Sequence, residues 1–345
     1  MQNIKIGAVK ELIIHNVGNK TNEEGTRFSD SVTDFSEIET EIKDLIESNF
    51  KFDELFSFHF LTSLDLNPVY TFLKSIFNDP SSFVEQSQNC GRYLYDKSTH
   101  PKIKSGELCL LYISDCEVDG LMIDAIALIK SENKDTVLNV SHKGDNFGIH
   151  AIKGMSVNKL DKGCLVFNKN GETGYVAAII DQSSRGSEAQ YWREDFLGLR
   201  PIQNEFHQTN QFLSITKQFV TNQMPEDFEI SKSEQIGLLS RSVEYFKSHE
   251  SFDKQEFEQE VLSDSSVIES FRKFDNTYRS ENNVEVADNF DISDRAVKKQ
   301  SKVFKKVLKL DRNFDIYIKG DREKIEKGVE LDGRKFYKIY FDVES

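Results

Sequence analysis

The sequence Tyr175-Val-Ala-Ala-Ile-Ile-Asp-Gln-Ser-Ser-Arg-Gly-Ser-Glu-Ala-Gln-Tyr-Trp-Arg-Glu-Asp-Phe-Leu-Gly-Leu-Arg200 marks a change in the kind of structure expected along the chain. Its apolar start, 175–180, predicts a buried strand. A polar loop follows, and Ser187 with Gln190 three residues later forms a capping-box pattern, which predicts the start of a helix. This stretch therefore joins a region of strands to a region of helices.

Upstream of this stretch the pattern is that of strands joined by short turns. Three hairpins are expected, formed by the segments 108–114 with 121–129, 136–141 with 147–152, and 164–167 with 175–180. Strands joined in this local way predict a largely antiparallel sheet. Helices expected near 36–50, 68–77 and 82–95 would cover one face of that sheet.

Downstream of the stretch the pattern is mainly helical. Apolar residues recur at helical spacing after Pro201, and Ser231 with Glu234 repeats the capping-box pattern. Short strands are expected near the C-terminal end. We therefore predict an α+β protein: a mixed N-terminal domain, residues 1–200, with an antiparallel sheet and covering helices, and a mainly helical domain, residues 201–345, with short C-terminal strands.

The charge is distributed unevenly along the chain. The formal net charge is −14 for 345 residues, which argues against a protein that is basic overall. Residues 201–294 contain 8 Lys and Arg against 19 Asp and Glu, whereas residues 295–312 contain 8 against 1. No apolar run approaches the length of a membrane span. The four cysteines show no metal-binding spacing and are typical of a reducing cytoplasm.

The basic segment predicts a helix over residues 295–309 that begins after Ser293. Its cations recur at intervals of three and four residues and would form one stripe on the helix, which could contact successive DNA phosphates. The alternative is a solvated helix face that neutralises the acidic segment before it or pairs across a dimer. The stripe consists of Arg295, Lys298, Lys299, Lys302, Lys305, Lys306 and Lys309.

Several segments together resemble those of the bacterial nucleoid-associated protein family of the YejK/NdpA type. They are Ile6-Gly-Ala-Val-Lys-Glu-Leu-Ile-Ile-His15, Gly106-Glu-Leu-Cys-Leu-Leu-Tyr112, Ile123-Asp-Ala-Ile-Ala-Leu-Ile129 and the strand–loop–helix stretch that ends in Asp195-Phe-Leu-Gly198. The order of the parts also matches. The resemblance implies a cytoplasmic protein of the nucleoid that binds DNA and has no catalytic activity.

The central stretch contains two further candidates. Arg185, beside the backbone N–H groups that open the expected helix, could help to bind an anion, or it could pair with Glu188 or Glu194. Trp192 shares a helical face with Phe196, so a place in the core is favoured over a role in stacking on nucleic-acid bases.

Residues that could support catalysis or metal binding are few. His142, Asp145 and His150 lie around one expected hairpin turn, and they would form a metal site only if the hairpin brought both imidazoles together. Turn polarity explains them better. No Walker, Gly-x-Ser-x-Gly or His-Glu-x-x-His pattern occurs. We therefore predict a protein that is not an enzyme and has no cofactor and no metal.

The function predicted from the sequence is binding of duplex DNA in the nucleoid, largely without sequence preference, through the basic residues of the 295–309 segment and Arg185. A homodimer would strengthen binding by presenting two basic stripes at once. In the competing hypothesis, the acidic region 201–294 docks a basic protein partner and the association with DNA is indirect. A third hypothesis is a metal-dependent nuclease whose carboxylates the sequence does not group. No membrane association is expected.

Overall fold

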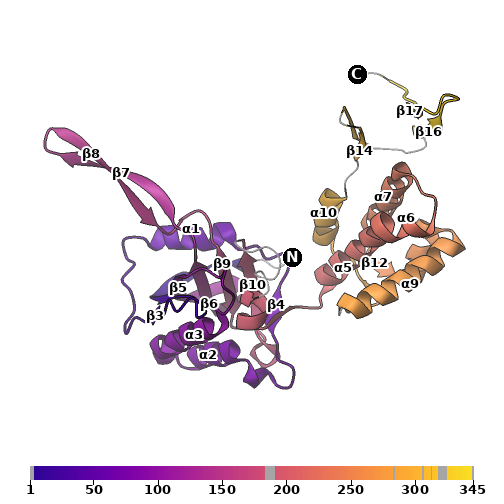
Figure 1. The fold of residues 1–345 in the computed structure, drawn as a ribbon. Helices are drawn as coiled ribbons and strands as arrows, with labels where there is room; N and C mark the ends of the chain where they lie inside the picture. The colour runs from indigo at the N-terminus through magenta and orange to yellow at the C-terminus, as the bar shows by residue number, and fades with distance from the viewer. Residues whose placement is uncertain are drawn as a thin grey trace. The chain divides into compact units, whose positions relative to one another are not determined.

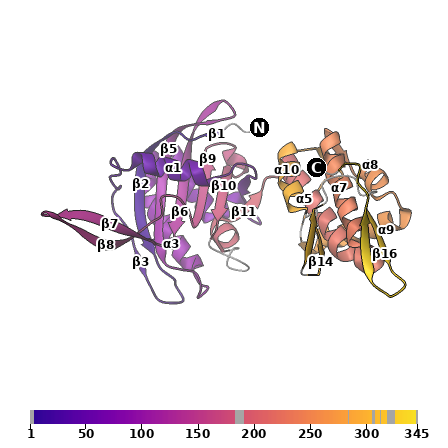
Figure 2. The same ribbon diagram turned by 90° about the horizontal axis from the view of Figure 1, so that it is seen from above.

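The chain divides into two compact units, Met1–Ile202 and Gln203–Ser345, which are called unit 1 and unit 2 below. A computed structural model describes residues 4–182, 191–282, 284–304, 307–311, 313–317 and 325–343. Figures 1 and 2 show these elements in two views. The predicted α+β class is confirmed, because unit 1 contains a large antiparallel sheet, unit 2 is mainly helical, and short strands end the chain.

Unit 1 is built on one antiparallel sheet, whose strands follow the order β11-β4-β10-β9-β6-β5-β2-β3, with β1 paired to β5. The central strands are the expected hairpins, β5 with β6 and β9 with β10. The strands are β1 (Ile4–Lys5), β2 (Ala8–Val17), β3 (Thr26–Arg27), β4 (Phe56–Phe58), β5 (Gly106–Val118), β6 (Leu121–Ser131), β9 (Lys162–Phe167), β10 (Val176–Asp181) and β11 (Leu199–Pro201).

Helices cover both faces of this sheet, so the expectation that they cover one face is wrong. Helices α2 (Pro68–Asn78) and α3 (Phe83–Lys97) pack on one face, and α1 (Glu39–Asn49) packs on the other. Figure 1 shows α1 and the α2–α3 pair on opposite sides of the strands. The reason lies in the central strands, which are apolar at consecutive positions rather than at alternate ones, so that both of their faces must be removed from water.

The hairpin expected from 136–152 forms, but it does not join the sheet. Strands β7 (Asp135–Lys143) and β8 (Asn146–Gly154) make a two-stranded sheet of their own. In both views this ribbon extends outward from its connections to β6 and β9. Its side chains are therefore free of the packing that covers the other strands of unit 1.

A buried histidine joins β2 to α3 in unit 1. His15 is 1% exposed, its Nδ1 accepts a hydrogen bond from the backbone N–H of Ser29 at 3.1 Å, and its Nε2 lies 2.9 Å from Ser87 Oγ. Since Nδ1 accepts, the neutral ring carries its proton on Nε2 and donates to the serine. Burial, aided by the charge of Arg92, lowers the pKa of His15 from 6.5 to about 4.

Because the folded pKa of His15 is depressed, its contribution to stability is fully present above pH 6.5 and is lost as the pH falls towards 4. We expect the free energy of unfolding of unit 1 to fall by about 2 kcal/mol between pH 7 and pH 5 from this residue alone. Urea unfolding followed by the fluorescence of Trp192, the only tryptophan in the chain, measures this change. The variant His15→Gln should lose most of this pH dependence. An equal pH dependence in that variant would contradict the assignment.

Unit 2 is a helical assembly with small antiparallel hairpins. Helix α7 begins with the predicted capping box, in which Ser231 and Glu234 each bond to the backbone of the other. The helices are α5 (Glu205–Gln218), α6 (Met224–Asp227), α7 (Lys232–Ser248), α8 (Lys254–Phe257), α9 (Ser265–Asn282) and α10 (Asp294–Val303), with π-helical turns at Phe219–Gln223 and Glu258–Leu262. The strands are β12 (Ser251–Asp253), β13 (Asn289–Asp291), β14 (Val307–Leu310), β15 (Phe314–Tyr317), β16 (Ile325–Val329) and β17 (Lys335–Ile339).

The core of unit 2 is built around phenylalanine rings. Phe212 of α5 is fully buried, and its ring centroid lies 4.2 Å from that of Phe252, 5.1 Å from that of Phe257 and 5.9 Å from that of Phe246. Aromatic side chains bury large areas and favour such tilted contacts. Among the described residues, no helix is both long and apolar enough to cross a membrane.

Candidate nucleic-acid interface

Helix α10 is anchored in unit 2 by one apolar face. Ala296 and Val297 are buried, and α10 packs against α5 and α7. Gln300, also buried, donates from Nε2 to Asn210 Oδ1 of α5 at 2.8 Å. Phe304, which ends the helix in an extended conformation, is 4% exposed. These contacts hold the helix in a single rotational setting, so that its opposite face points to solvent.

The opposite side is the cationic face of α10, which consists of Arg295, Lys298, Lys299 and Lys302. The spacing of these residues by three and four places them in one stripe. Lys298, Lys299 and Lys302 are exposed and Arg295 is half-buried. Lys299 Nζ lies 5.3 Å from the centre of the Phe206 ring, an arrangement that favours a cation–π contact. Within the described part of the chain, Lys298 and Lys302 form no ion pair.

The prediction of a single helix over residues 295–309 is wrong at its C-terminal end. Helix α10 ends at Val303, and Val307–Leu310 forms β14, which pairs with β15. The segment Val307-Leu-Lys-Leu310 fits helical spacing with the residues before it, but its last three residues also alternate apolar and polar as a strand does. Residues 307–310 form a strand rather than a helix because the backbone groups of β15, after the turn, complete a ladder of hydrogen bonds with them.

The remaining predicted cations are therefore not part of the helical stripe that the structure shows. Lys309 lies in β14, in register with Asp315 of β15. Lys305, Lys306 and Arg185 lie outside the described residues. The helix start predicted at Ser187 also lies outside them.

The metal site considered at the hairpin turn is not assembled. In the register of β7 and β8, His142 pairs with Phe147 and His150 pairs with Asn139. Because successive residues of a strand point to opposite faces, the two imidazoles lie on opposite faces of the ribbon. Asp145, in the turn, therefore has no pair of imidazoles beside it.

The prediction that Trp192 belongs to the core is confirmed. It is fully buried in the π-helical turn Tyr191–Leu197, and its ring centroid lies 5.1 Å from that of Phe196. Its indole Nε1 donates to the carbonyl oxygen of Gly163 in β9 at 3.4 Å. The tryptophan therefore attaches this turn to the sheet and offers no face to a base.

A buried charged cluster in unit 1 was missed by the sequence analysis. Lys130 of β6 and Lys162 of β9 are both 0% exposed, and Glu132 lies between them, with Nζ–Oε distances of 3.1 and 4.0 Å. Lys162 Nζ is also 2.8 Å from Asp181 Oδ1, and the Tyr191 hydroxyl donates to Glu132 at 2.9 Å. The only sequence signal is a lysine at the end of an apolar segment, Lys130 after one and Lys162 before another, and this position does not reveal burial.

Opposite charges and hydrogen bonds satisfy the two lysines and Glu132, whereas the second carboxylate oxygen of Asp181, Oδ2, is buried without a hydrogen-bond partner among the described residues. Burial lowers the pKa of Lys130, while Glu132 opposes that shift. Burial also raises the pKa of Tyr191, so its hydroxyl keeps its proton and remains a donor to Glu132. The cluster ties β6, β9 and β10 to the π-helical turn, and we assign it a structural role in unit 1.

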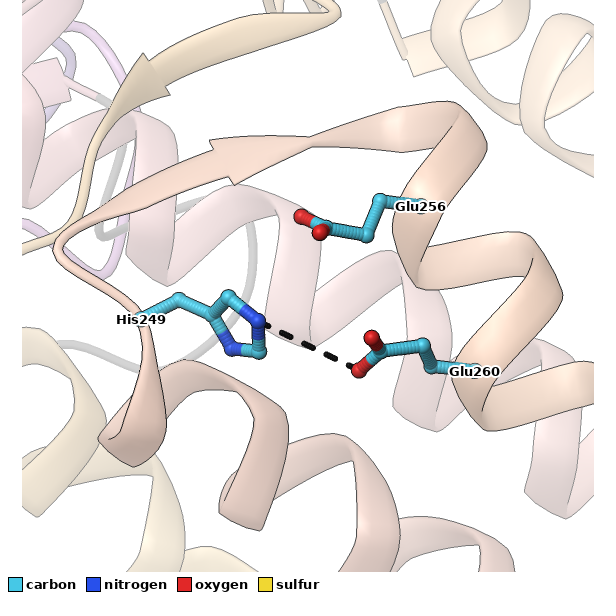
Figure 3. A group of neighbouring side chains, drawn as sticks. All are labelled: His249, Glu256 and Glu260. Carbon is cyan, nitrogen blue, oxygen red and sulfur yellow. Dashed lines mark ion pairs between the residues drawn. The ribbon is translucent and has the colours of Figure 1, made fainter.

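A second group of ionisable side chains lies in unit 2, where His249, Glu256 and Glu260 face one another (Figure 3). His249 Nε2 lies 4.0 Å from Glu260 Oε2, and its Nδ1 lies 2.9 Å from the carbonyl oxygen of Tyr245. The Tyr245 hydroxyl donates to Glu256 at 2.9 Å. These donor types can hold a divalent cation, but both glutamates are exposed, and the contact between His249 and Glu260 accounts for the arrangement equally well.

The fold is that of an α+β protein, and α10 presents a cationic face to solvent. Residues 13–336 match the model of the family described as nucleoid-associated protein YejK. The chain therefore belongs to this nucleoid-associated family, as the resemblance of its segments predicted. No curated protein matches the chain.

Proposed function

We propose that this chain binds duplex DNA of the bacterial nucleoid without sequence preference and without catalysing a reaction. The observation that carries the proposal is the cationic face of α10, with Lys298 and Lys302 exposed one turn apart on a helix whose other face is buried. Membership of a nucleoid-associated family supports DNA as the polyanion. Such a protein would act in the cytoplasm, on the chromosome and its organisation.

The physical basis of binding is the release of counterions. Lys298 and Lys302 are separated by about 6 Å along the helix axis, which allows them to reach neighbouring phosphates. Phosphate contacts carry no sequence information, so the binding would be tolerant of sequence and steeply dependent on salt. Lys305, Lys306, Lys309 and Arg185 remain part of the proposal as cations predicted from the sequence.

A homodimer belongs to the same proposal. One short cationic face on a chain of net charge −14 provides weak affinity, because the rest of the surface repels DNA. Two copies that bind one duplex together convert the second contact into an intramolecular one and raise the affinity without any new type of contact.

The proposal is tested with the double variant Lys298→Glu/Lys302→Glu in the full-length chain. Fluorescence anisotropy with a labelled duplex, measured over a series of salt concentrations, should show at least a tenfold loss of affinity. The slope of log K against log salt should become shallower by about 2, one unit for each lost phosphate contact. Lys299 is left unchanged because it also contacts Phe206.

The matched control is Lys247→Glu/Lys273→Glu, which makes the same change in net charge on exposed residues of unit 2. It should retain most of the affinity and the original salt slope. Equal losses in both variants would mean that general charge, not α10, governs binding. If the unmodified chain has no affinity for duplex at low salt, direct binding is wrong, and the hypothesis of a basic protein partner for residues 201–294 is favoured.

Incubating the duplex with Mg²⁺ and protein tests for nuclease activity.

A further inference from the structure

The β7–β8 ribbon has two faces of different character. Residues that are paired across the two strands share a face, and successive pairs alternate between faces. One side is the apolar face of the ribbon, formed by Leu138, Val140, Phe147, Ile149 and Ala151, with His142 beside Phe147 on the same face. The opposite face is polar in its central part, where it presents Asn139, Ser141, Gly148 and His150, and has one apolar pair, Val137 with Ile152, nearer its base. The ribbon therefore has one apolar and one mainly polar face, like a sheet that packs against a second layer through its apolar side.

This apolar face is left uncovered in the single chain. Leu138, Phe147 and Ile149 are 65%, 71% and 66% exposed, respectively, and Val140 is 59% exposed. A two-stranded ribbon is only marginally stable in water by itself and needs more strands or a packed face. Contiguous exposed apolar side chains of this kind mark a surface that binds another macromolecule.

The charges of the ribbon indicate what covers the face. Residues 135–154 carry two lysines and two aspartates, so the ribbon is neutral in a chain of net charge −14. Two copies of an acidic chain repel one another overall, whereas the neutral ribbons meet without net repulsion. The apolar face is also flanked by opposite charges, with Lys153 at its base and Asp145 at its tip. In an antiparallel pair of ribbons, each Lys153 lies beside the Asp145 of the other copy.

We propose that the apolar face of the ribbon is the surface through which two copies of this chain associate, face to face and antiparallel about a two-fold axis. Such an isologous contact buries the same side chains from both copies. Ile149 of β8 lies midway in sequence between Lys153 and the turn residue Asp145, so the axis passes close to it. The inference assigns a surface to the homodimer of the proposed function, and its test is made without DNA.

The first test is sedimentation equilibrium of the full-length chain over a range of concentrations. The unmodified chain should be a dimer, and Val140→Asp/Ile149→Asp should raise the dimer dissociation constant at least about 30-fold. The control Asn139→Asp/His150→Asp makes the same charge change on the opposite face of the same strands and should leave the dimer intact. A monomeric unmodified chain, or a dimer unaffected by the first variant, overturns the proposal.

Two further variants test the antiparallel arrangement. Lys153→Glu and Asp145→Lys should each weaken the dimer, because residues 153 and 145 of opposite copies would then carry like charges at both of their contacts. The two changes combined should restore the dimer, because the charges are again opposite. Ile149→Cys should form a disulfide-linked dimer on oxidation, whereas Ser141→Cys on the polar face should not. The four native cysteines are buried and should not contribute. Absence of both the restoration and the cross-link overturns the arrangement.

The dimer experiments also separate this inference from the DNA proposal. Suppose that Lys298→Glu/Lys302→Glu leaves DNA binding unchanged while Val140→Asp/Ile149→Asp becomes monomeric. The dimer surface is then supported, and the proposal that α10 binds DNA is wrong. If Val140→Asp/Ile149→Asp abolishes DNA affinity but keeps the dimer, the ribbon contacts DNA instead of a second copy, and the inference is wrong.

Discussion

Replacing Asp275 by Asn is expected to lower the free energy of unfolding of unit 2 by about 3–5 kcal/mol. The Asp275 side chain is 0% exposed, and its two oxygens lie 2.6 Å from Lys254 Nζ and 2.6 Å from Arg279 Nε. Both cations are mostly buried, with side chains 16% and 18% exposed. Removing the negative charge leaves the two cations close together and poorly hydrated, with the largely exposed Asp288 as their remaining carboxylate among the described contacts. Losing the buried partner in this way is the costly way to break a buried ion pair.

The effect should reach the segment that precedes α10. Lys254 and Arg279 also lie 3.7 and 3.8 Å, respectively, from Asp288, which stands just before β13. Arg279 Nη1 donates to the carbonyl oxygen of Val286 in the same segment. Asp275 therefore positions two cations that hold this part of the chain against α8 and α9. Loss of the Asp275 charge should therefore make the segment around residues 286–288, which precedes α10, less stably attached to α8 and α9.

Hydrogen exchange followed by mass spectrometry on peptides from α8 and α9 measures the expected loss in unit 2. Adding Lys254→Gln to Asp275→Asn should recover part of the stability, because one uncompensated cation is removed. Glu244→Gln, which breaks the exposed pair with Lys247, is the control and should have little effect. A loss below 1 kcal/mol in Asp275→Asn would show that the ion pairs are solvated.

The second large effect is expected in unit 1 from Glu132→Gln, which keeps the size of the side chain and removes its charge. Among the described contacts, Lys162 would then keep its ion pair with Asp181, whereas Lys130 would lose its ion pair with a carboxylate. At pH 7 the free energy of unfolding of unit 1 should fall by about 3–5 kcal/mol. The fluorescence of Trp192 during urea unfolding reports this unit, because Trp192 is the only tryptophan.

The loss in Glu132→Gln should depend on pH. Burial already lowers the pKa of Lys130, and without Glu132 the pKa falls further, so the folded state favours the neutral amine. The cost of the variant is therefore largest near neutral pH and shrinks as the pH rises towards the pKa of an unfolded lysine. Unfolding at pH 7 and pH 9 measures this difference. Glu117→Gln, which breaks the exposed pair with Lys5, should show little change at either pH. A loss that is the same at both pH values would contradict the argument.

Local patterns in the sequence were sufficient for much of unit 1 and for the start of unit 2. The predicted pairing of segment 164–167 with 175–180 is confirmed by the hairpin of β9 and β10, in which Val176 pairs with Phe167. The capping box at Ser231 correctly predicted the start of α7. The place of Trp192 in the core followed from its helical spacing with Phe196. In each case the deciding residues lie within a few positions of one another, so the sequence contains the whole signal.

The candidate interface could be predicted only in part. The spacing of Arg295, Lys298, Lys299 and Lys302 was sufficient to place them in one helical stripe, and α10 shows that stripe. The continuation to Lys309 was wrong, because Val307–Leu310 pairs with a strand that follows it. Helical and strand periodicity overlap over so short a segment, and only the hydrogen-bonded partner distinguishes them.

The sequence by itself determined the α+β class, the family and the presence of one basic segment in an acidic chain, because periodicity, turn residues and charge are local properties. Only the tertiary structure decided that helices cover both faces of the sheet, that Lys130 and Lys162 are buried together, and that the β7–β8 ribbon stands apart from the sheet. Burial and strand partners are set by contacts between residues far apart in the chain. A lysine or an apolar strand has the same local sequence whether such a contact forms or not.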